Sequence, residues 1–405
     1  MCQGETKIMD SLFDDRPTMY EGSKLSLRSE LSSMTVPSTD ISCLYSSDYM
    51  QVYPLLSVRE PNNPLEFLIL ADNNSYLDLS ESYLHLTCRV KKADGSNCGA
   101  TDLVAPANLF FHMIFKNLEV YMNGKCISDS QNMYHFIAYI NRLLTMPTSL
   151  KSTKLKNELW FPNISPNTYE ATSAGYKDRY QLAALSKSFS LMGQLVGGIF
   201  QQPRWIPAGT ELKIVLRRNP ANFCLDNKVT TTAYKYEIED AVFLVARKPV
   251  SPKIIELHRS LLEKNETFKF ITPEAVVKTI SIPAGMTSIT SDAILIGAVP
   301  KVIVIGLVKS SAVAGVLTES PTNFEHFNLS NVTVTWQGDS IETRSIPLNF
   351  KTATNTSPDA FLLGLHSLQK CVANELMGAG ISRDNYTQGR SPLHYWNCVW
   401  RENHT

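Results

Sequence analysis

Two stretches of the sequence match each other, and this internal repeat constrains the fold more than any other feature. The first copy, PANLFFHMIFKNLEVYMNGKCI, covers residues 106–127, and the second, PTNFEHFNLSNVTVTWQGDSI, covers residues 321–341. A constant shift along the chain aligns a phenylalanine, a histidine, an asparagine, a glycine and an isoleucine of one copy with the same residues of the other. The copies lie much too far apart for a solenoid repeat. The sequence therefore predicts two copies of one domain.

Within each copy, apolar and polar residues alternate in the way that is typical of a β-strand with one buried face. Each strand then meets a turn dipeptide, Asn123-Gly124 or Gln337-Gly338, in which glycine accepts a positive φ at little cost. The residues that the pattern assigns to the core and turn of this structural repeat are Leu118, Val120, Met122 and Gly124 in the first copy, and Val332, Val334, Trp336 and Gly338 in the second.

The rest of the first half shows the same β pattern on both sides of the repeat. Apolar runs and alternating segments predict strands at residues 65–70, 83–92, 189–200, 210–218 and 234–245. Many short strands separated by turn signals are typical of a β-sandwich or jelly roll.

Two segments of the first half depart from this pattern. Apolar residues at helical spacing predict a helix that ends near Leu144, with Asp129 or Ser130 as its N-cap. Residues 145–186 are rich in lysine, serine, asparagine and proline, which predicts a long surface excursion. Three lysines of this segment are expected to form a solvated face: Lys151, Lys154 and Lys156.

The second half is expected to repeat the plan of the first. Ser251-Pro252 predicts the start of a connecting helix, because serine is a good N-cap and proline fits the first helical position. Strands are predicted at residues 278–282 and 302–308, and the continuous apolar run of the latter predicts burial on both faces. Ser357-Pro358 opens another predicted helix, so a helix follows the repeated hairpin in both halves.

These patterns divide the chain of 405 residues into four parts. They are an N-terminal arm at residues 1–60, a first jelly roll at 61–250, a connecting helix at 251–264 and a second jelly roll at 265–405. The predicted fold class is all-β, a double jelly roll made of two tandem antiparallel β-sandwich domains with short helices.

The charge and cysteine content argue against several classes of protein. Lys plus Arg and Asp plus Glu both number 38, and a general nucleic-acid-binding protein should instead carry a basic excess. None of the cysteines forms a C-x-x-C pair or a zinc spacing, so we expect free thiols in a reducing compartment. The N-terminal residues lack the apolar core of a signal peptide, and no apolar run is long enough to span a membrane. We therefore expect a protein that is not secreted and has no membrane span.

The sequence predicts no catalytic, cofactor-binding or metal-binding residues. It contains no H-x-H or H-E-x-x-H pair, no P-loop, and no G-x-G-x-x-G or G-x-S-x-G motif. His112 and His326 share one repeat position, which fits either a paired functional site or a structural histidine inside each sandwich, and we favour the second interpretation. We expect folding to require no metal, nucleotide or covalent cofactor.

Several blocks, in one order along the chain, resemble a known family. They are SELSSMTVPSTDIS, YLDL, YLHL, APANLFFHMIFKNLEVYMNG, VPKVIVIGLV, NFEHFNLSNVTVTWQGDSI and ISRDNYTQG. Together they cover residues 29–389 and resemble the double jelly-roll major capsid protein, or hexon, of Polinton (Maverick) elements and adintoviruses. The block around the first repeat copy, APANLFFHMIFKNLEVYMNG, is the most distinctive of them.

The resemblance implies a structural protein without a catalytic step. It implies two jelly rolls side by side in one chain and a homotrimer, which forms a pseudo-hexameric capsomer that tiles an icosahedral shell. The implied partners are further copies of the chain, neighbouring capsomers and a penton or minor capsid protein, without sequence-specific nucleic acid. The implied location is the virion capsid, after synthesis in the host cell and a stay in its nucleus or cytoplasm.

Two departures from the family leave alternatives open. Residues 1–28 precede the family's usual start, and the chain stops soon after Gly389, where the family continues with further strands. We therefore expect the second jelly roll to be incomplete at its C-terminus and assembly to be poor. The alternatives are a non-enzymatic β-sandwich binding or attachment protein, and a decayed or domesticated element gene product that is unable to assemble. A cupin-like enzyme is disfavoured because the sequence lacks its metal motif.

Overall fold

A computed structural model describes residues 48–70, 73–163, 167–270, 272, 274–291, 300, 302–336, 339–340, 348, 350, 361–362 and 394–397. The chain divides into two compact units, residues 1–43 and 44–405, and every described residue belongs to the second unit.

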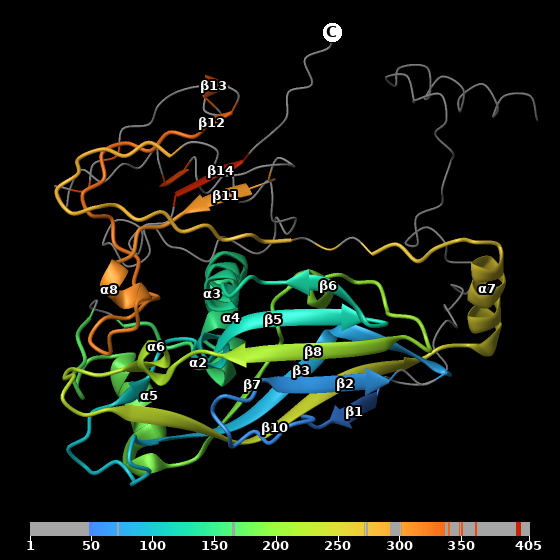
Figure 1. The fold of residues 1–405 in the computed structure, drawn as a ribbon, viewed down its shortest axis with the longest axis horizontal. Helices are drawn as coiled ribbons and strands as arrows, with labels where there is room; N and C mark the ends of the chain where they lie inside the picture. Colours follow the sequence, from blue (N-terminus) through green and yellow to red (C-terminus); the bar gives the residue numbers. More distant parts are fainter. Residues whose placement is uncertain are drawn as a thin grey trace, which may run out of the picture. The chain divides into compact units, whose positions relative to one another are not determined.

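The described chain is dominated by two four-stranded antiparallel sheets that lie face to face (Figure 1). One sheet has the order β1 (Asp48–Val52), β10 (Tyr234–Pro249), β3 (Ser75–Lys92) and β7 (Phe189–Gly193). The other has the order β2 (Leu65–Leu70), β8 (Glu211–Arg218), β5 (Phe115–Met122) and β6 (Lys125–Asp129).

The connections between these strands identify the topology. Apart from the hairpin β5–β6, each strand of the two sheets is followed along the chain by a strand of the opposite sheet. A double sheet wound in this way is a jelly roll. Strands β4 (Ala105–Pro106) and β9 (Leu225–Asp226) form a small additional pair. The predicted all-β, antiparallel jelly-roll class is confirmed.

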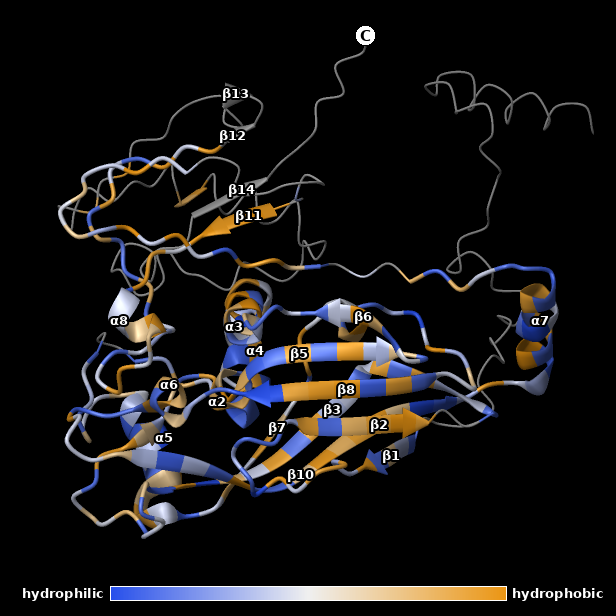
Figure 2. Ribbon diagram, in the orientation of Figure 1, coloured by the Kyte–Doolittle hydropathy of each residue, from blue (hydrophilic) through white to orange (hydrophobic). Residues whose placement is uncertain are grey.

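The core lies between the two sheets because the strands alternate in hydropathy (Figure 2). On β3, Leu84, Leu86, Cys88 and Val90 are fully buried, whereas the residues between them are half-exposed. Burying side chains of this size contributes roughly 1.5–3 kcal/mol each. The alternation in the sequence had predicted that these four residues form the buried face of the strand. Burial also raises the pKa of the Cys88 thiol to about 12.

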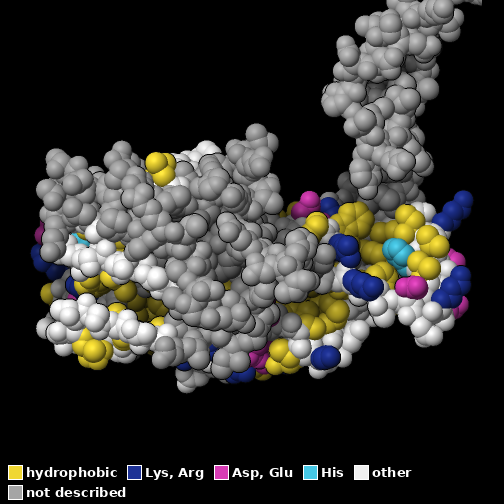
Figure 3. Space-filling view, turned by 90° about the horizontal axis from the view of Figure 1, so that it is seen from above, with side chains coloured by type: hydrophobic (Ala, Val, Ile, Leu, Met, Phe, Trp, Pro, Cys, Tyr) yellow, Lys and Arg dark blue, Asp and Glu magenta, His cyan; other side chains and the backbone are white. Residues whose placement is uncertain are grey.

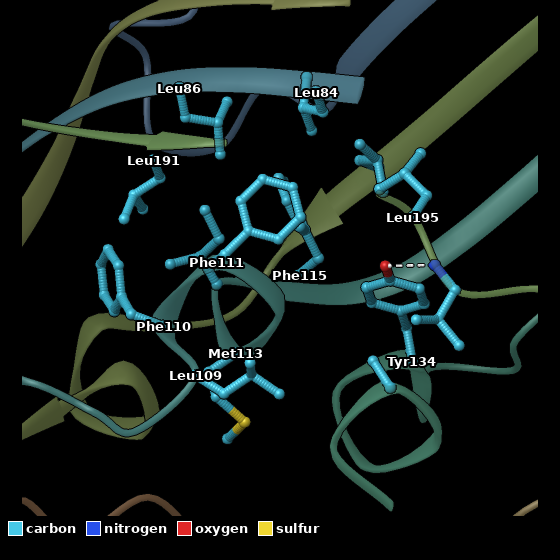
Figure 4. Packing of buried hydrophobic residues seen from close by; sticks show 14 of the residues in the cluster. Leu84, Leu86, Leu109, Phe110, Phe111, Met113, Phe115, Tyr134, Leu191 and Leu195 are labelled. Atoms are coloured by element: carbon cyan, nitrogen blue, oxygen red, sulfur yellow. Dashed lines mark hydrogen bonds between the residues drawn. The ribbon is translucent and has the colours of Figure 1, made fainter. Parts of the chain in front are cut away.

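A short helix fills one end of the sandwich. Within the first repeat copy, α2 (Phe110–Met113) places Phe110 and Phe111 against Leu86, Leu191 and neighbouring core residues (Figure 4). The four residues of α2 are buried. This part of the first repeat copy is helical rather than extended. The strand pattern begins only at β5.

The helix after the hairpin starts later than the sequence predicted. Helix α3 (Tyr134–Thr145) has Met133 at its N-cap and no side-chain capping bond, so Asp129 and Ser130 were wrong as candidates. The Ser130 hydroxyl is used elsewhere: it accepts from Leu118 N at 2.8 Å and donates to Asn117 Oδ1 at 2.7 Å. Ser130 therefore fastens the end of the hairpin instead of capping a helix.

The segment at residues 145–186 is folded onto the sandwich, which corrects the predicted surface excursion. It contains α4 (Thr148–Lys151), η2 (Lys154–Glu158), α5 (Tyr176–Ala183) and η3 (Ala184–Ser186). Lys151 is buried, with its Nζ donating to Leu143 O at 2.7 Å, so it does not belong to a solvated face. Lys156 is exposed, as predicted. Two more short helices, η4 (Gly198–Phe200) and α6 (Ala221–Cys224), complete this part.

After the jelly roll, helix α7 (Pro252–Glu263) begins at the predicted serine N-cap and proline. Residues 278–282 form no strand, and Ile280 and Ile282 are about half-exposed, so that prediction was wrong. The run at 302–308 provides β11 (Val302–Ile305), which is half-buried rather than buried on both faces. The remaining elements are α8 (Ser310–Val313), β12 (Thr335–Trp336), β13 (Asp339–Ser340) and β14 (His394–Asn397).

The pairing of β14 with β11 was not foreseen. The register joins Val302 to Asn397 and Ile305 to His394, so the last segment of the sequence contributes a strand where none was expected. Residues 1–47 of the predicted arm and the helix predicted from Ser357-Pro358, apart from Phe361 and Leu362, lie outside the described residues. The proposed division into domains stays a prediction.

The buried face of β5 yields a test of the strand assignment. We expect Val120→Asp to lower the free energy of unfolding by about 4 kcal/mol, because Val120 is only 1% exposed and a carboxylate there has no partner. Val334→Asp should cost less, since Val334 is half-buried. Urea denaturation of both variants, with Lys125→Asp on the exposed strand β6 as control, measures the difference. Equal stability of Val120→Asp and the control would contradict the assignment.

Candidate functional site

The structure places the first-copy residues of the predicted repeat core in β5 and its turn, and it packs Val332 of the second copy against the hydrophobic cluster to which Leu118 and Val120 belong. Leu118 and Val120 are buried in β5, Met122 is half-buried, and Gly124 has φ +77 in the turn. That positive φ is the conformation for which the sequence predicted a glycine.

In the second copy, Val332 and Val334 are half-buried but lie outside any strand. Strand β12 includes only Thr335 and Trp336, and Gly338 lies outside the described residues. The two copies therefore do not form matching strands of equal length within the described chain. Their common role as a repeat core stays a prediction.

The two histidines at the shared repeat position have different surroundings. His112 is fully buried inside the jelly roll. His326 is half-buried, its ring stacks on Phe350 with centroids 4.7 Å apart, and its Nδ1 accepts from Asn328 N at 2.9 Å. The structural interpretation holds for His112, whereas the two rings do not form a matched pair.

His112 belongs to a buried ionic network around Glu158. Arg142 donates to both carboxylate oxygens of Glu158, from Nε at 3.2 Å and from Nη2 at 3.1 Å, and His112 Nε2 lies 3.1 Å from Oε2. The Tyr134 hydroxyl lies 2.9 Å from His112 Nδ1 and accepts from Val196 N at 3.2 Å, the bond drawn in Figure 4. One tautomer satisfies all of these groups: His112 donates from Nε2 and accepts the Tyr134 proton at Nδ1.

Burial and pairing set the protonation states in this network. Burial lowers the pKa of His112, and the charge of Arg142 lowers it further, which keeps the imidazole neutral near pH 7. Burial alone would raise the pKa of Glu158, but His112 and Arg142 more than offset this and hold it below its usual range. The network is therefore a carboxylate–guanidinium pair with a neutral histidine as hydrogen-bond donor.

A second buried pair ties the folded segment to the small sheet. Arg179 is fully buried, and its Nη1 donates to Asp226 Oδ2 at 2.8 Å and also to Pro106 O. Its Nε donates to Phe161 O at 3.1 Å and its Nη2 to Asn163 Oδ1 at 2.5 Å. Burial raises the pKa of Asp226, and Arg179 offsets part of that effect. The guanidinium thus holds α5 against β4 and β9.

Sequence reasoning missed Glu158 and Arg179 because both lie in a polar segment without a regular period. The segment's composition predicted exposure. The buried charges are tolerated only because α2, α3 and β9 supply their hydrogen-bond and charge partners. No feature of the sequence links Glu158 to Arg142 or Arg179 to Asp226. Both pairs are closed to solvent, with each side chain at most 5% exposed.

The described part of the chain contains no group of three or more histidine, cysteine, aspartate or glutamate side chains placed to hold a metal ion. None of its helices combines the length and the apolar composition that a membrane span needs.

Comparisons with known proteins give distant similarities. No family model matches the chain. An uncharacterized protein of Caenorhabditis elegans is 22% identical over 318 residues, which cover 76% of this chain and 74% of the worm protein.

Among solved structures, similar chains include several major capsid proteins of viruses. The mavirus major capsid protein is 12% identical, with 72% of this chain and 56% of that chain covered and a TM-score of 0.35. The Sputnik virophage structure is 11% identical, with 57% and 53% covered and a TM-score of 0.38. The Faustovirus major capsid protein is 9% identical, with 63% and 62% covered and a TM-score of 0.35. In each case the match spans less than two thirds of the solved chain.

The buried histidines predict how stability depends on pH. Burial lowers the pKa of His112 and lowers that of His135 to about 4, so below about pH 6.5 the unfolded chain binds more protons than the folded chain. The free energy of unfolding should therefore fall as the pH drops from 7 to 5, by up to about 1.4 kcal/mol per pH unit for each histidine. Denaturant titrations at several pH values measure this slope.

The matched comparison for this prediction is between two variants. His112→Asn removes one of the protonation sites and should reduce the slope, although it also lowers stability. Thr87→Asn, on the half-exposed outer side of β3, removes no titratable group and should leave the slope unchanged. An unaltered slope in His112→Asn would show that the buried network does not control the pH dependence.

Proposed function

We propose that this chain is a structural major capsid protein of the Polinton or adintovirus class, which trimerises into pseudo-hexameric capsomers of an icosahedral shell. The observation that carries the proposal is the jelly-roll strand order of residues 48–250, which is the fold that the sequence resemblance implies. The most distinctive block of that resemblance lies at the centre of this jelly roll, in α2 and β5.

The placement of the charged groups supports a non-enzymatic role. Glu158, Arg142, His112, Arg179 and Asp226 are ionisable groups inside the protein, and each side chain is at most 5% exposed. Perturbed ionisable groups that act on a substrate must be reached by it. Here the same features hold short helices onto a sandwich, which is the role expected in a building block.

The surface carries exposed hydrophobic side chains that are suited to contacts between copies of the chain. Figure 3 shows hydrophobic side chains gathered over α7, and no residue of this helix is buried. Leu257 is 55% exposed and Leu262 is 49% exposed. Apolar surface of this kind marks interaction sites in soluble proteins. The zero net charge of the chain adds no long-range repulsion between copies.

The proposal includes partners, location and domain roles. Further copies of the chain form the trimer, neighbouring capsomers surround it, and a penton or minor capsid protein completes the shell. The protein resides in the virion capsid after a stay in the host nucleus or cytoplasm. The part of the predicted arm, residues 1–60, that precedes β1 acts as an arm, 251–264 as the connecting helix and 265–405 as the second jelly-roll domain.

Sedimentation of the full chain tests the proposal. We expect a species of three times the 45.3 kDa chain mass, and hexagonal particles or shells in electron micrographs, both only at high protein concentration because assembly is expected to be poor. A chain that stays monomeric at every concentration, with no metal or other additive changing that result, would contradict a capsid role. A folded monomer that binds a cell-surface glycan would instead favour the attachment-protein alternative.

The exposed face of α7 gives a variant for this assay. Leu257 and Leu261 are one turn apart on α7, so Leu257→Gln with Leu261→Gln removes apolar surface from one side of the helix. We expect this double variant to dissociate at a dilution at least about a hundredfold lower than the unaltered chain, because burial of two leucines contributes about 3 kcal/mol or more. Arg259→Gln on the same helix is the matched control. Identical self-association of all three proteins would exclude α7 from the contact.

A further inference from the structure

A hollow of about 200 Å³ lies on the surface of the jelly roll where β8 ends. Its lining residues are Pro61, Asn62, Pro64, Arg217 and Arg218. The pocket therefore combines two consecutive arginines with a short proline-containing loop, and none of these residues takes part in the buried networks around Glu158 and Arg179.

The strand register explains why these parts meet. Strand β2 begins at Leu65, which pairs with Leu216 of β8 in antiparallel register. The residues just before β2 therefore run beside the residues just after Leu216, which are Arg217 and Arg218. Proline has no N–H to continue the ladder, so the loop at 61–64 leaves the sheet at this point and the hollow opens beside it.

Arg218 is a cation without a charge partner. Its Nη2 donates to Val58 O at 2.7 Å, and its buried Nε has no hydrogen-bond partner among the described residues. Within that part of the chain, no carboxylate lies at ion-pair distance from it. Burial lowers the pKa of this guanidinium. A partly buried charge of this kind is costly unless an anion compensates it.

Arg217 supplies a second positive charge, and only one of its nitrogens is paired with a carboxylate. Its Nε donates to Glu119 Oε1 at 2.7 Å, while its side chain remains 55% exposed. Glu119 also accepts from Asn117 Nδ2 at 3.0 Å and from Tyr121 OH at 2.8 Å. Glu119 therefore pairs with Arg217 through Nε alone, and the terminal nitrogens of Arg217 have no partner among the described residues.

We propose that this hollow is a binding site for a small free oxyanion of the phosphate class. Guanidinium groups present parallel N–H donors that match the oxygens of phosphate, and such charge-assisted bonds are about twice as strong as neutral ones. The Asn62 side-chain amide adds a neutral donor at the rim. The bound anion neutralises the charge excess of Arg217 and Arg218 and couples the loop before β2 to the end of β8.

The shape and charge of the protein favour a small ligand over a nucleic-acid backbone. The hollow is compact and is bounded by Pro61 and Pro64, whereas a strand of nucleic acid follows an extended basic groove. The neighbouring Lys213 is already paired with Glu66 at 3.0 Å, so the positive surface does not continue along β8. The chain as a whole carries no basic excess.

Calorimetric titration of the full chain with inorganic phosphate tests the proposal, with sodium chloride of matched ionic strength as reference. We expect saturable binding of one phosphate per chain. Arg217→Gln and Arg218→Lys should each weaken it by about tenfold, the second because lysine lacks the planar fork. Lys213→Gln, which removes a positive charge from the same strand outside the hollow, should change the affinity by less than about twofold.

A variant with the opposite expected effect sharpens the test. Glu119→Gln keeps the side-chain shape and frees Arg217, so phosphate should bind more tightly. Thermal unfolding confirms that each variant is folded, and Arg217→Gln, at an exposed side chain, carries the test if Arg218→Lys is unstable. Absence of saturable phosphate binding, or equal weakening by Lys213→Gln and Arg217→Gln, would overturn the proposal. Binding of a short single-stranded oligonucleotide without binding of free phosphate would also overturn it.

Discussion

One buried carboxylate controls how the end of the jelly roll is closed. Glu158 lies inside the protein, where an ionised group is tolerated only with a charge partner and filled hydrogen bonds. Arg142 from α3 and His112 from α2 supply both. The carboxylate also leaves no room at β7, because a Cβ at Gly193 would lie 2.8 Å from Glu158 Cγ. Two helices, one strand and the segment at 145–186 thus depend on one charge.

The residues that stabilise the interior of the protein are distinct from the residues that are exposed on its surface. The apolar side chains of β3, β5, β8 and β10 meet between the sheets, and the ionic groups that share this interior are paired. Outer positions carry pairs such as Arg89 with Glu239 and Lys91 with Glu237, which are partly exposed and contribute little to stability. On this surface, the exposed leucines of α7 are suited to a protein partner, and the arginines at the end of β8 are suited to a ligand.

Strands were predictable wherever the period of two was clean. The alternation at residues 83–92 led to β3, and the run at 210–218 led to β8 within one residue. Prediction failed where a tertiary contact competed with a local signal. Ser130 is a good capping residue by type, yet its hydroxyl is bound to the β5 backbone and to Asn117. Residues 278–282 alternate well, but within the described chain they have no neighbouring strand to pair with.

The sequence by itself determined the all-β class and most strands of the sandwich with their buried faces, because side-chain alternation along a strand depends only on local geometry. It also determined the glycine turn after β5, since glycine has no Cβ and accepts a positive φ at little cost. It did not determine β1, which lies in the predicted arm. The tertiary structure alone decided which charges are buried and which meet at the surface. Glu158 with Arg142, Arg179 with Asp226, and Arg217 beside the loop at 61–64 are pairs of residues far apart in the chain. Their contacts follow from the way helices, loops and strands pack together in the folded chain, which no local pattern encodes.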